Sequence, residues 1–202
     1  MKLPKTKTHP ARGLWSSNLK KVFFFLTLLL PLVFYSCSGD ENEPDPGPDT
    51  TVPYSVTISD QNKNMPSGGT ITSEFSDSPK GSEIGKVVDN NKTTNFVTSQ
   101  SKYYILWKGS KTAAINYYTL TSATDAPEKD PKSWTLSGSN DNKTWTLLDT
   151  QTAQTFSQRQ ETKNYEFVNK TAYQYYKLEI QSNNGGTFTQ IAEWTMEVKI
   201  DP

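Results

Sequence analysis

Oxygen-bearing side chains gather in one short segment, residues 89–94, which reads Asp-Asn-Asn-Lys-Thr-Thr. Asp and Asn tolerate the left-handed backbone angles of tight turns, so the segment predicts a turn. A hard cation such as calcium takes about six to eight oxygen ligands and mixes carboxylates with hydroxyls and backbone carbonyls. The segment therefore indicates a calcium site. The alternative is that Asp89 only caps the turn through hydrogen bonds.

Residues for the commonest hydrolytic mechanisms are nearly absent from the sequence. The single histidine, His9, and the single cysteine, Cys37, both lie near the start of the chain. Ser–His and Cys–His catalysis, and zinc sites built from these residues, therefore have no candidates in the rest of the sequence. A carboxylate pair acting on a glycosidic bond stays open by composition, but such a reaction needs a deep cleft. We expect a protein that is not an enzyme.

Charge is distributed unevenly along the 202 residues. The chain carries 21 Lys and Arg and 21 Asp and Glu, and six of the basic residues but no acidic residue precede position 37. The rest of the sequence carries 15 basic residues against 21 acidic ones, a net charge of −6. Nucleic acid is bound by clustered Lys and Arg that neutralise phosphates. The distribution therefore argues against nucleic acid as a partner.

The first part of the sequence has the pattern of a signal peptide. Two lysines, Lys20 and Lys21, precede the unbroken apolar run 22–34. The run is shorter than the roughly 20 residues that a membrane-spanning helix needs, and its length suits the apolar region of a signal peptide. A transmembrane helix is the alternative reading.

The apolar run ends in Phe-Tyr-Ser-Cys, with the cysteine at position 37. This ending resembles the lipobox of bacterial lipoproteins, in its Bacteroidetes-like form, and implies that Cys37 is lipidated and becomes the mature N-terminus. Phe34 and Tyr35 depart from the commonest lipobox residues, so cleavage by the ordinary signal peptidase stays open.

The segment after Cys37 is acidic and rich in proline, which predicts a solvated tether. Acidic residues this close to a lipidated cysteine resemble the surface-export signal of such lipoproteins. We expect a lipid-anchored protein of the outer membrane, exposed at the cell surface. The expected organisation is a signal peptide over 1–36, a tether over 37–51 and one domain over 52–202.

The domain reads as all-β. Short runs rich in Thr, Tyr, Val, Ile and Trp are separated by clusters of Gly, Asn, Asp and Pro, and no long stretch has apolar residues at helical spacing. The predicted strands are 54–58, 103–107, 114–121, 133–139, 144–149, 164–167, 175–180 and 191–200.

The hairpin over 133–145 is the most specific local pattern. Trp134, Leu136 and Gly138 alternate with polar residues, the segment 140–143 predicts a tight turn, and Trp145 opens the returning strand. The sequence S-W-T-L-S-G-S-N-D-N-K-T-W resembles the W-x-L-x-G-S-N-D-G-x-x-W hairpin of discoidin, or coagulation factor 5/8 type C, domains.

Other segments are similar to the same family in the same order. Residues 87–96 resemble its hydrophobic-D-G-D-x-x-T-x-W loop, with Asn in place of Gly and of the second Asp and with Phe in place of Trp. Residues 175–180 and 191–194 resemble its last strands, Y-R-L-x-I and I-A-E-hydrophobic. The resemblance covers positions 60–200 and implies a galactose-binding-domain-like jelly-roll β-sandwich of about eight strands, similar to family 32 carbohydrate-binding modules.

The resemblance also implies a structural calcium ion. By position, its ligands would be the carboxylates of Asp89 and Glu193, the Thr94 hydroxyl and a carbonyl near Asn91.

The family binds ligands through loops at one end of the sandwich, where rings stack on sugars and polar groups bond hydroxyls. The four tryptophans of the domain fall in or beside predicted strands and are interpreted as packing residues. The expected ligand-binding residues are Asp125, Lys129, Asp130, Arg159, Asn183, Asn184 and Phe188. The alternative for Arg159 is a structural salt bridge to the Asp130 loop.

These observations together predict a cell-surface lipoprotein with a non-catalytic, carbohydrate-binding discoidin-like module. The expected partners are a glycan and, through the lipid, the membrane. The alternative function is an adhesin, or a protein-binding component of a surface complex, because sandwiches of this family also bind proteins.

Overall fold

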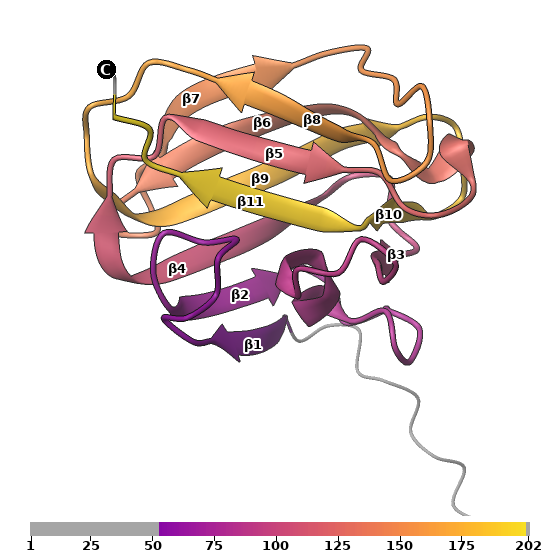
Figure 1. Cartoon of the computed structure of the whole chain (residues 1–202), viewed down its shortest axis with the longest axis horizontal. Coiled ribbons are helices and arrows are strands. Elements are labelled where there is room, and N and C mark those ends of the chain that lie inside the picture. Colours follow the sequence, from indigo (N-terminus) through magenta and orange to yellow (C-terminus); the bar gives the residue numbers. More distant parts are fainter. Residues whose placement is uncertain (1–52, 201–202) are drawn as a thin grey trace, which may run out of the picture. The chain divides into compact units, whose positions relative to one another are not determined.

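The computed structural model describes residues 53–200, and these form a β-sandwich with two short 3₁₀ helices (Figure 1). The eleven strands of the described residues are β1 (Tyr54–Ile58), β2 (Gly69–Ser73), β3 (Phe96–Thr98), β4 (Tyr103–Ala113), β5 (Tyr117–Thr121), β6 (Pro131–Ser139), β7 (Thr146–Gln151), β8 (Thr162–Glu166), β9 (Tyr173–Asn183), β10 (Thr189–Ile191) and β11 (Glu193–Glu197). The 3₁₀ helices are η1 (Ile84–Val88) and η2 (Pro127–Lys129). The expected signal peptide, lipidation site and tether lie outside the described residues.

The strands form a six-stranded sheet, in the order β1-β2-β4-β9-β6-β7, and a three-stranded sheet, in the order β11-β5-β8. The short strands β10 and β3 pair with each other. All of these pairings are antiparallel. Figure 1 shows the three-stranded sheet lying across the six-stranded one. The predicted all-β sandwich is therefore confirmed.

Aromatic side chains from both sheets fill the space between them. The Trp134 ring of β6 meets the Tyr165 ring of β8 edge-on, with centroids 5.4 Å apart, and its indole N–H donates to the Tyr118 hydroxyl of β5 (2.8 Å). Tyr118 in turn donates to Asp149 of β7 (2.6 Å). Because this chain of hydrogen bonds satisfies the buried polar atoms, two large polar aromatics can lie in the core without an unpaired group.

The predicted hairpin is present as β6 and β7, and its turn is organised by one carboxylate. Asp141 accepts hydrogen bonds from the backbone N–H groups of Lys143 (2.8 Å) and Thr144 (2.7 Å), while Asn142 adopts a positive φ of 57°. Gly138 of β6 is required by close packing, because a Cβ atom there would lie 2.4 Å from the Tyr173 ring.

The strand predictions differ from the structure at several points. Strands β2, β3 and β10 were not predicted, since β2 has a single apolar side chain and three-residue strands show no alternation. The predicted strand over 191–200 is wrong in extent: it is interrupted at Ala192 and ends at Glu197. The predicted strand over 114–121 begins only at Tyr117, because β4 continues through Ala113 before the chain reverses.

Candidate functional site

The four residues expected to bind calcium lie together. Helix η1 ends at Val88 and is followed by Asp89, and the next residue, Asn90, has a positive φ of 60°, which folds the segment back on itself. The Asn91 N–H donates to Asp89 Oδ1 (3.0 Å) and to Glu193 Oε1 of β11 (2.5 Å). The Thr94 hydroxyl lies 2.8 Å from Asp89 Oδ2 and 2.9 Å from the Asn91 carbonyl. We call residues 89–94 the acidic turn.

Burial and a neighbouring carboxylate act on Glu193. The side chain is only 3% exposed, and this desolvation, reinforced by the negative charge of Asp89, raises the pKa of Glu193 to about 7. The Asn64 side-chain amide donates to Glu193 Oε2. Two carboxylates that converge on one backbone N–H repel each other, and a cation between them would relieve that repulsion.

The donor set of the acidic turn therefore fits a hard cation. The Thr94 hydroxyl lies within hydrogen-bonding distance of the Asp89 carboxylate and of the Asn91 carbonyl, and Glu193 shares the Asn91 N–H with Asp89. Carboxylate, hydroxyl and carbonyl oxygens are all ligands that calcium prefers. Within residues 53–200 no group of three or more His, Cys, Asp and Glu side chains could hold a metal. Calcium would therefore need carbonyls and water to complete its coordination. The Lys86 ammonium, 3.5 Å from Asp89 Oδ2, is a competing cation.

The expected ligand-binding residues also come together, on three loops at the end of the sandwich where β5, β7 and β9 finish. We call loops 122–130, 152–161 and 184–188 the loop end. Arg159 makes a bidentate ion pair with Asp130, with nitrogen–oxygen distances of 2.9 and 2.5 Å, and also donates to the Asp125 carbonyl (3.2 Å). This ion pair is the salt bridge to the Asp130 loop that we gave as the alternative role of Arg159. Burial raises the pKa of Asp130, and the guanidinium opposes that shift.

The third loop is closed by its own polar groups. The Asn183 side-chain amide donates to the carbonyls of Gly186 and Phe188, both at 2.9 Å, and the Asn184 N–H donates to the Asp130 carbonyl (2.9 Å). Asn183 is buried, whereas the Phe188 ring is 38% exposed. The Lys129 ammonium lies 5.8 Å from the centroid of that ring. Phe188 is thus the accessible ring of the loop end, and Asn183 serves to hold its loop.

The acidic turn and the loop end are hydrogen-bonded to each other. Gln160 donates to the Lys92 carbonyl (2.9 Å), and the Lys92 ammonium donates to the Thr162 hydroxyl (2.7 Å). Two residues of this region were not predicted from the sequence. Gln190 donates to the Asp125 carbonyl (2.6 Å), and Asn64 contacts Glu193 from 129 positions away. Neither lies in a motif, so only the tertiary fold reveals them.

The tryptophans of the described residues divide into two groups. Trp107, Trp134 and Trp194 are almost completely buried, which confirms their interpretation as core residues. Trp145 is half-buried on the surface of the six-stranded sheet, with the Lys177 ammonium 4.7 Å from its ring centroid. None of the four tryptophans lies at the loop end.

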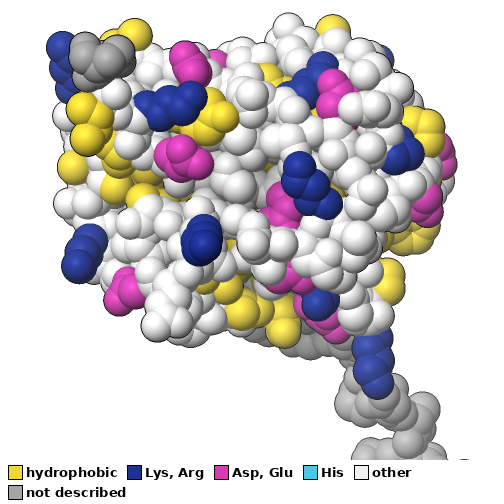
Figure 2. All heavy atoms as spheres, viewed as in Figure 1, with side chains coloured by type: hydrophobic (Ala, Val, Ile, Leu, Met, Phe, Trp, Pro, Cys, Tyr) yellow, Lys and Arg dark blue, Asp and Glu magenta, His cyan; other side chains and the backbone are white. Residues whose placement is uncertain are grey.

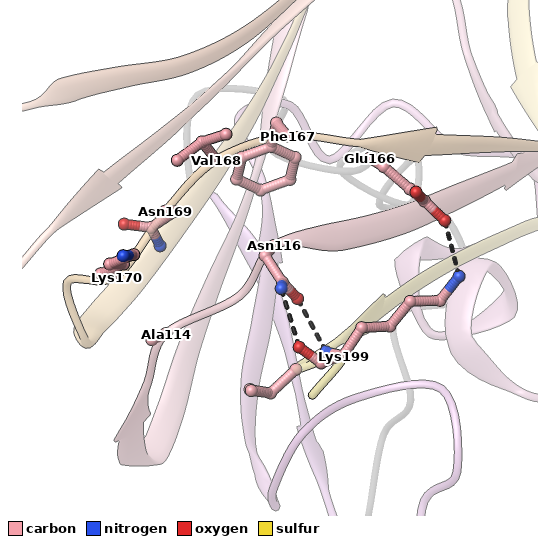
Figure 3. Close-up of a pocket in the computed structure, with 9 residues that line it drawn as sticks. Ala114, Asn116, Glu166, Phe167, Val168, Asn169, Lys170 and Lys199 are labelled. Carbon is pink, nitrogen blue, oxygen red and sulfur yellow. Dashed lines mark hydrogen bonds and ion pairs between the residues drawn. The ribbon is translucent and has the colours of Figure 1, made fainter. Parts of the chain in front are cut away.

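A hollow of about 480 Å³ lies where β8 and β11 end, and its residues are shown in Figure 3. Asn116 and the Lys199 backbone exchange two hydrogen bonds (2.8 and 2.7 Å), and the Lys199 ammonium pairs with Glu166 (2.8 Å). These polar groups satisfy one another, and no residue predicted for ligand or metal binding lines the hollow. The hydrogen bonds and the ion pair around the hollow hold Lys199, near the end of the described residues, to Asn116 before β5 and to Glu166 of β8.

Across residues 53–200 there is no helix with the length and apolar character needed to cross a membrane.

Solved structures with a similar fold include carbohydrate-binding modules. The family 32 module of Clostridium perfringens NanJ, in complex with galactose, is 16% identical, with a TM-score of 0.53 over 71% of this chain and 100% of the module. The family 32 module of Streptococcus pneumoniae EndoD is 14% identical, with a TM-score of 0.54 over 74% of this chain and 99% of the module. A Clostridium perfringens module in complex with GalNAc-β-1,3-galactose is 16% identical, with a TM-score of 0.52 over 72% of this chain and 95% of the module. The expected galactose-binding-domain-like fold is confirmed by these similarities.

Sequence comparison gives a narrower result. No family profile matches the chain. A segment of 52 residues, 25% of this chain, is 56% identical to peptide-N(4)-(N-acetyl-beta-glucosaminyl)asparagine amidase of Arabidopsis thaliana. The match spans 7% of the length of that enzyme.

Proposed function

We propose that this protein is a non-catalytic carbohydrate-binding module that presents its loop end to a glycan. The observation that carries the proposal is the accessible Phe188 ring, which is 38% exposed and has the Lys129 ammonium beside it. Its loop is hydrogen-bonded through the Asn184 N–H to Asp130, the ion-pair partner of Arg159. A ring supplies an apolar surface for the face of a sugar, while the charged and amide groups around it can bond hydroxyls. The fold shared with modules solved in complex with galactose and with GalNAc-β-1,3-galactose supports the same function.

The ion pair at the loop end contributes order to this site. A guanidinium held by two hydrogen bonds to a buried carboxylate loses little further freedom when a ligand arrives. Arg159 keeps a quarter of its side chain exposed, so it can still donate to a sugar hydroxyl while it holds Asp130. The structural and the ligand-binding roles of Arg159 are therefore compatible.

Calcium at the acidic turn is part of the proposal. Asp89 and Glu193 would supply carboxylates, Thr94 a hydroxyl and Asn91 a carbonyl. The ion would neutralise the two carboxylates and fix the turn, and the turn touches the loop end through Gln160 and Lys92. Its role would be structural.

The location follows from the first part of the sequence. We propose that Cys37 is lipidated and anchors the protein to the outer membrane, with the domain at the cell surface. The support is the apolar run 22–34 that ends at Cys37 and the acidic, Pro-rich segment after it.

A glycan array probed with the purified chain, once with calcium and once with a chelator, tests the function. We expect binding to a galactose- or hexosamine-type epitope, and loss of that binding in Phe188→Ala. Phe188 is exposed, so this substitution should leave the circular dichroism spectrum unchanged. Silence across the array by a folded chain would contradict the proposal and favour the alternative, a protein partner at the surface.

A further inference from the structure

The outer face of the six-stranded sheet carries aromatic and basic side chains in its centre. Along β4, Tyr103, Ile105 and Trp107 are buried, so the residues between them project from the opposite face. Strand β9 lies beside β4, with Leu106 paired to Lys177 and Lys108 to Tyr175. We call this surface the sheet face. Its central residues are Tyr104, Leu106, Lys108, Tyr175, Lys177, Glu179 and, from the β6–β7 turn, Trp145.

Each ring of the sheet face lies close to a lysine. The Lys177 ammonium is 4.7 Å from the Trp145 ring centroid and 5.9 Å from that of Tyr104. The Lys108 ammonium is 5.7 Å from the Tyr175 centroid. At an exposed site an ammonium is held only weakly by a ring at this distance, so a stronger partner can draw it away.

Two hollows lie at the ends of the row of rings. One, of about 260 Å³, is lined by Tyr104 and Lys177 together with Lys102 and Glu74. The other, of about 400 Å³, is lined by Lys108 with Thr57 and Thr70 from the neighbouring strands. The side chains between the two hollows lie on the paired strands β4 and β9, along which an elongated ligand could lie.

Two ammonium groups on this surface have no carboxylate partner among the described residues. Glu179 is paired with Lys177 (3.4 Å), and Glu74 accepts the Tyr104 N–H (3.1 Å). Lys102 and Lys108 make no ion pair with any residue between 53 and 200. Lys102 lines the smaller hollow and Lys108 lines the larger one.

Asp60, the acid of the larger hollow, accepts the Gly68 N–H (2.6 Å) and lies 3.3 Å from the Ser110 hydroxyl. Its carboxylate is thus already used to hold the β1–β2 loop. Lys102 and Lys108 are therefore the ammonium groups of this surface that are free to meet a carboxylate of a ligand.

We propose that the sheet face is a second carbohydrate site, which binds a polysaccharide chain that carries carboxylates on its sugar rings. The Trp145, Tyr104 and Tyr175 rings stack on sugar faces. Lys177 and Lys108 move from the rings to carboxylates, and the hydroxyl-bearing strand residues bond sugar hydroxyls. This site is separate from the loop end, and it goes beyond the function proposed above.

The test uses the full chain in detergent micelles, since the sequence contains the apolar run 22–34. Affinity electrophoresis in polygalacturonate measures binding to a carboxylated chain. Carboxyl-reduced polygalacturonate has the same linkages with galactose in place of galacturonate, so the two polymers are compared in the Phe188→Ala variant, whose loop end should no longer bind galactose. We expect retardation by polygalacturonate, at least about tenfold weaker binding to the reduced chain, and weakening by salt. The double variant Lys102→Gln, Lys108→Gln should lose about tenfold in affinity without a change in fold, because both side chains are exposed.

Two variants distinguish binding at the sheet face from binding at the loop end. Trp145→Ala should weaken polygalacturonate binding about tenfold, whereas Phe188→Ala should leave it unchanged. Lys163→Gln is the matched control, because its ammonium also lies over a ring, 5.4 Å from Phe156, but on β8 of the other sheet.

No binding by the folded chain, equal binding to the reduced polymer, or loss in Phe188→Ala with retention in Trp145→Ala would each overturn the proposal. So would sedimentation showing a dimer that Trp145→Ala dissociates, since a second copy would then cover the face.

Discussion

The loop end and the sheet face present two different kinds of surface on one sandwich. At the loop end, irregular segments are held by buried polar groups such as Asp130 and Asn183, and one ring stands exposed among them. At the sheet face, regular strands hold several half-buried rings in fixed register, with lysines lying over them. The first arrangement suits the end or branch of a glycan, and the second suits the length of a chain.

The outer surface of the three-stranded sheet offers a further contrast. Its projecting residues along β5 and β11 include Thr119, Thr121 and Thr195, which bond to neighbouring hydroxyls. Figure 2 shows charged groups of both signs on this side, together with separate hydrophobic areas. On β5 a single ring, that of Tyr117, has a lysine over it, with the Lys199 ammonium 3.5 Å from the centroid. The set of several such rings is therefore a property of the six-stranded sheet and is not required by the fold.

Asp130→Asn should lower the free energy of unfolding more than the other substitutions considered. It should disturb the loop end and leave the sheet face unchanged. The carboxylate is 3% exposed and holds Arg159 by two hydrogen bonds. We expect a loss of about 3 kcal/mol of unfolding free energy, the lower part of the range for a broken buried pair, because Arg159 can reach solvent. Urea denaturation at pH 7 measures it.

The matched variant for this pair is Arg159→Leu, which removes the other partner. In a double-mutant cycle the two substitutions should be strongly non-additive. A loss under about 1 kcal/mol for Asp130→Asn would mean that the ion pair does not hold the loop end. Polygalacturonate binding by the folded variant should persist, since the sheet face is separate.

Calcium should stabilise the acidic turn by a similar amount. At about one hundred times its dissociation constant, a ligand that binds only the folded state adds about 2.7 kcal/mol, which raises the melting temperature by several degrees. Glu193→Gln should abolish this response, whereas Glu197→Gln, an exposed glutamate on the same strand, should retain it. A melting curve that is identical in calcium and in chelator would remove the calcium site.

Gly138→Ala should act on the strands that support the sheet face. The new methyl group would lie 2.4 Å from the Tyr173 ring, and we expect overpacking to cost about 2 kcal/mol. Gly85→Ala is the control, because its methyl group would meet Val56 at 3.6 Å, an ordinary contact. Thermal denaturation of both variants measures the difference. Equal stability of the two would show that Tyr173 moves aside freely.

Asp141→Asn should produce the smallest effect, and its signature is a weaker pH dependence of stability in acid. Hydrogen bonds from the backbone N–H groups of Thr144 and Lys143 lower the pKa of Asp141 to about 2. Its folded-state pKa lies below the unfolded value of about 4, so its stabilisation is present above pH 4 and is lost between about pH 4 and pH 2.

Stability measured across that window should depend less on pH in Asp141→Asn than in the unmodified chain. Asp125→Asn, at another exposed aspartate, is the comparison. If both variants keep the full pH dependence, the turn that carries Trp145 is not held by this carboxylate.

The sequence predicted the features that depend on neighbouring residues. The β6–β7 hairpin was predictable because alternation, turn residues and two tryptophans fall within one short segment. The acidic turn was predictable for the same reason, and its partner Glu193 was found because it lies in a second family motif. The seven residues expected to bind a ligand do lie together at one end of the sandwich, and their ligand-binding role stays a prediction.

Features that depend on strand register could not be predicted from the sequence. Tyr104 and Lys177 lie 73 positions apart, and only the pairing of β4 with β9 brings them together. The contact of Asn64 with Glu193 likewise requires the β1–β2 loop to cross β11. Trp145 could be assigned to the hairpin, but its half-exposed position on the sheet face could not.

The unequal burial of the tryptophans makes the domain its own optical probe. A polar quencher such as iodide or acrylamide should reach the Trp145 indole well before it reaches those of Trp107, Trp134 and Trp194. With Trp15 replaced by Phe, the accessible part of the emission would come mainly from the sheet face. A sugar chain lying on that face would protect this component from quenching, and a sugar at the loop end would leave it unchanged.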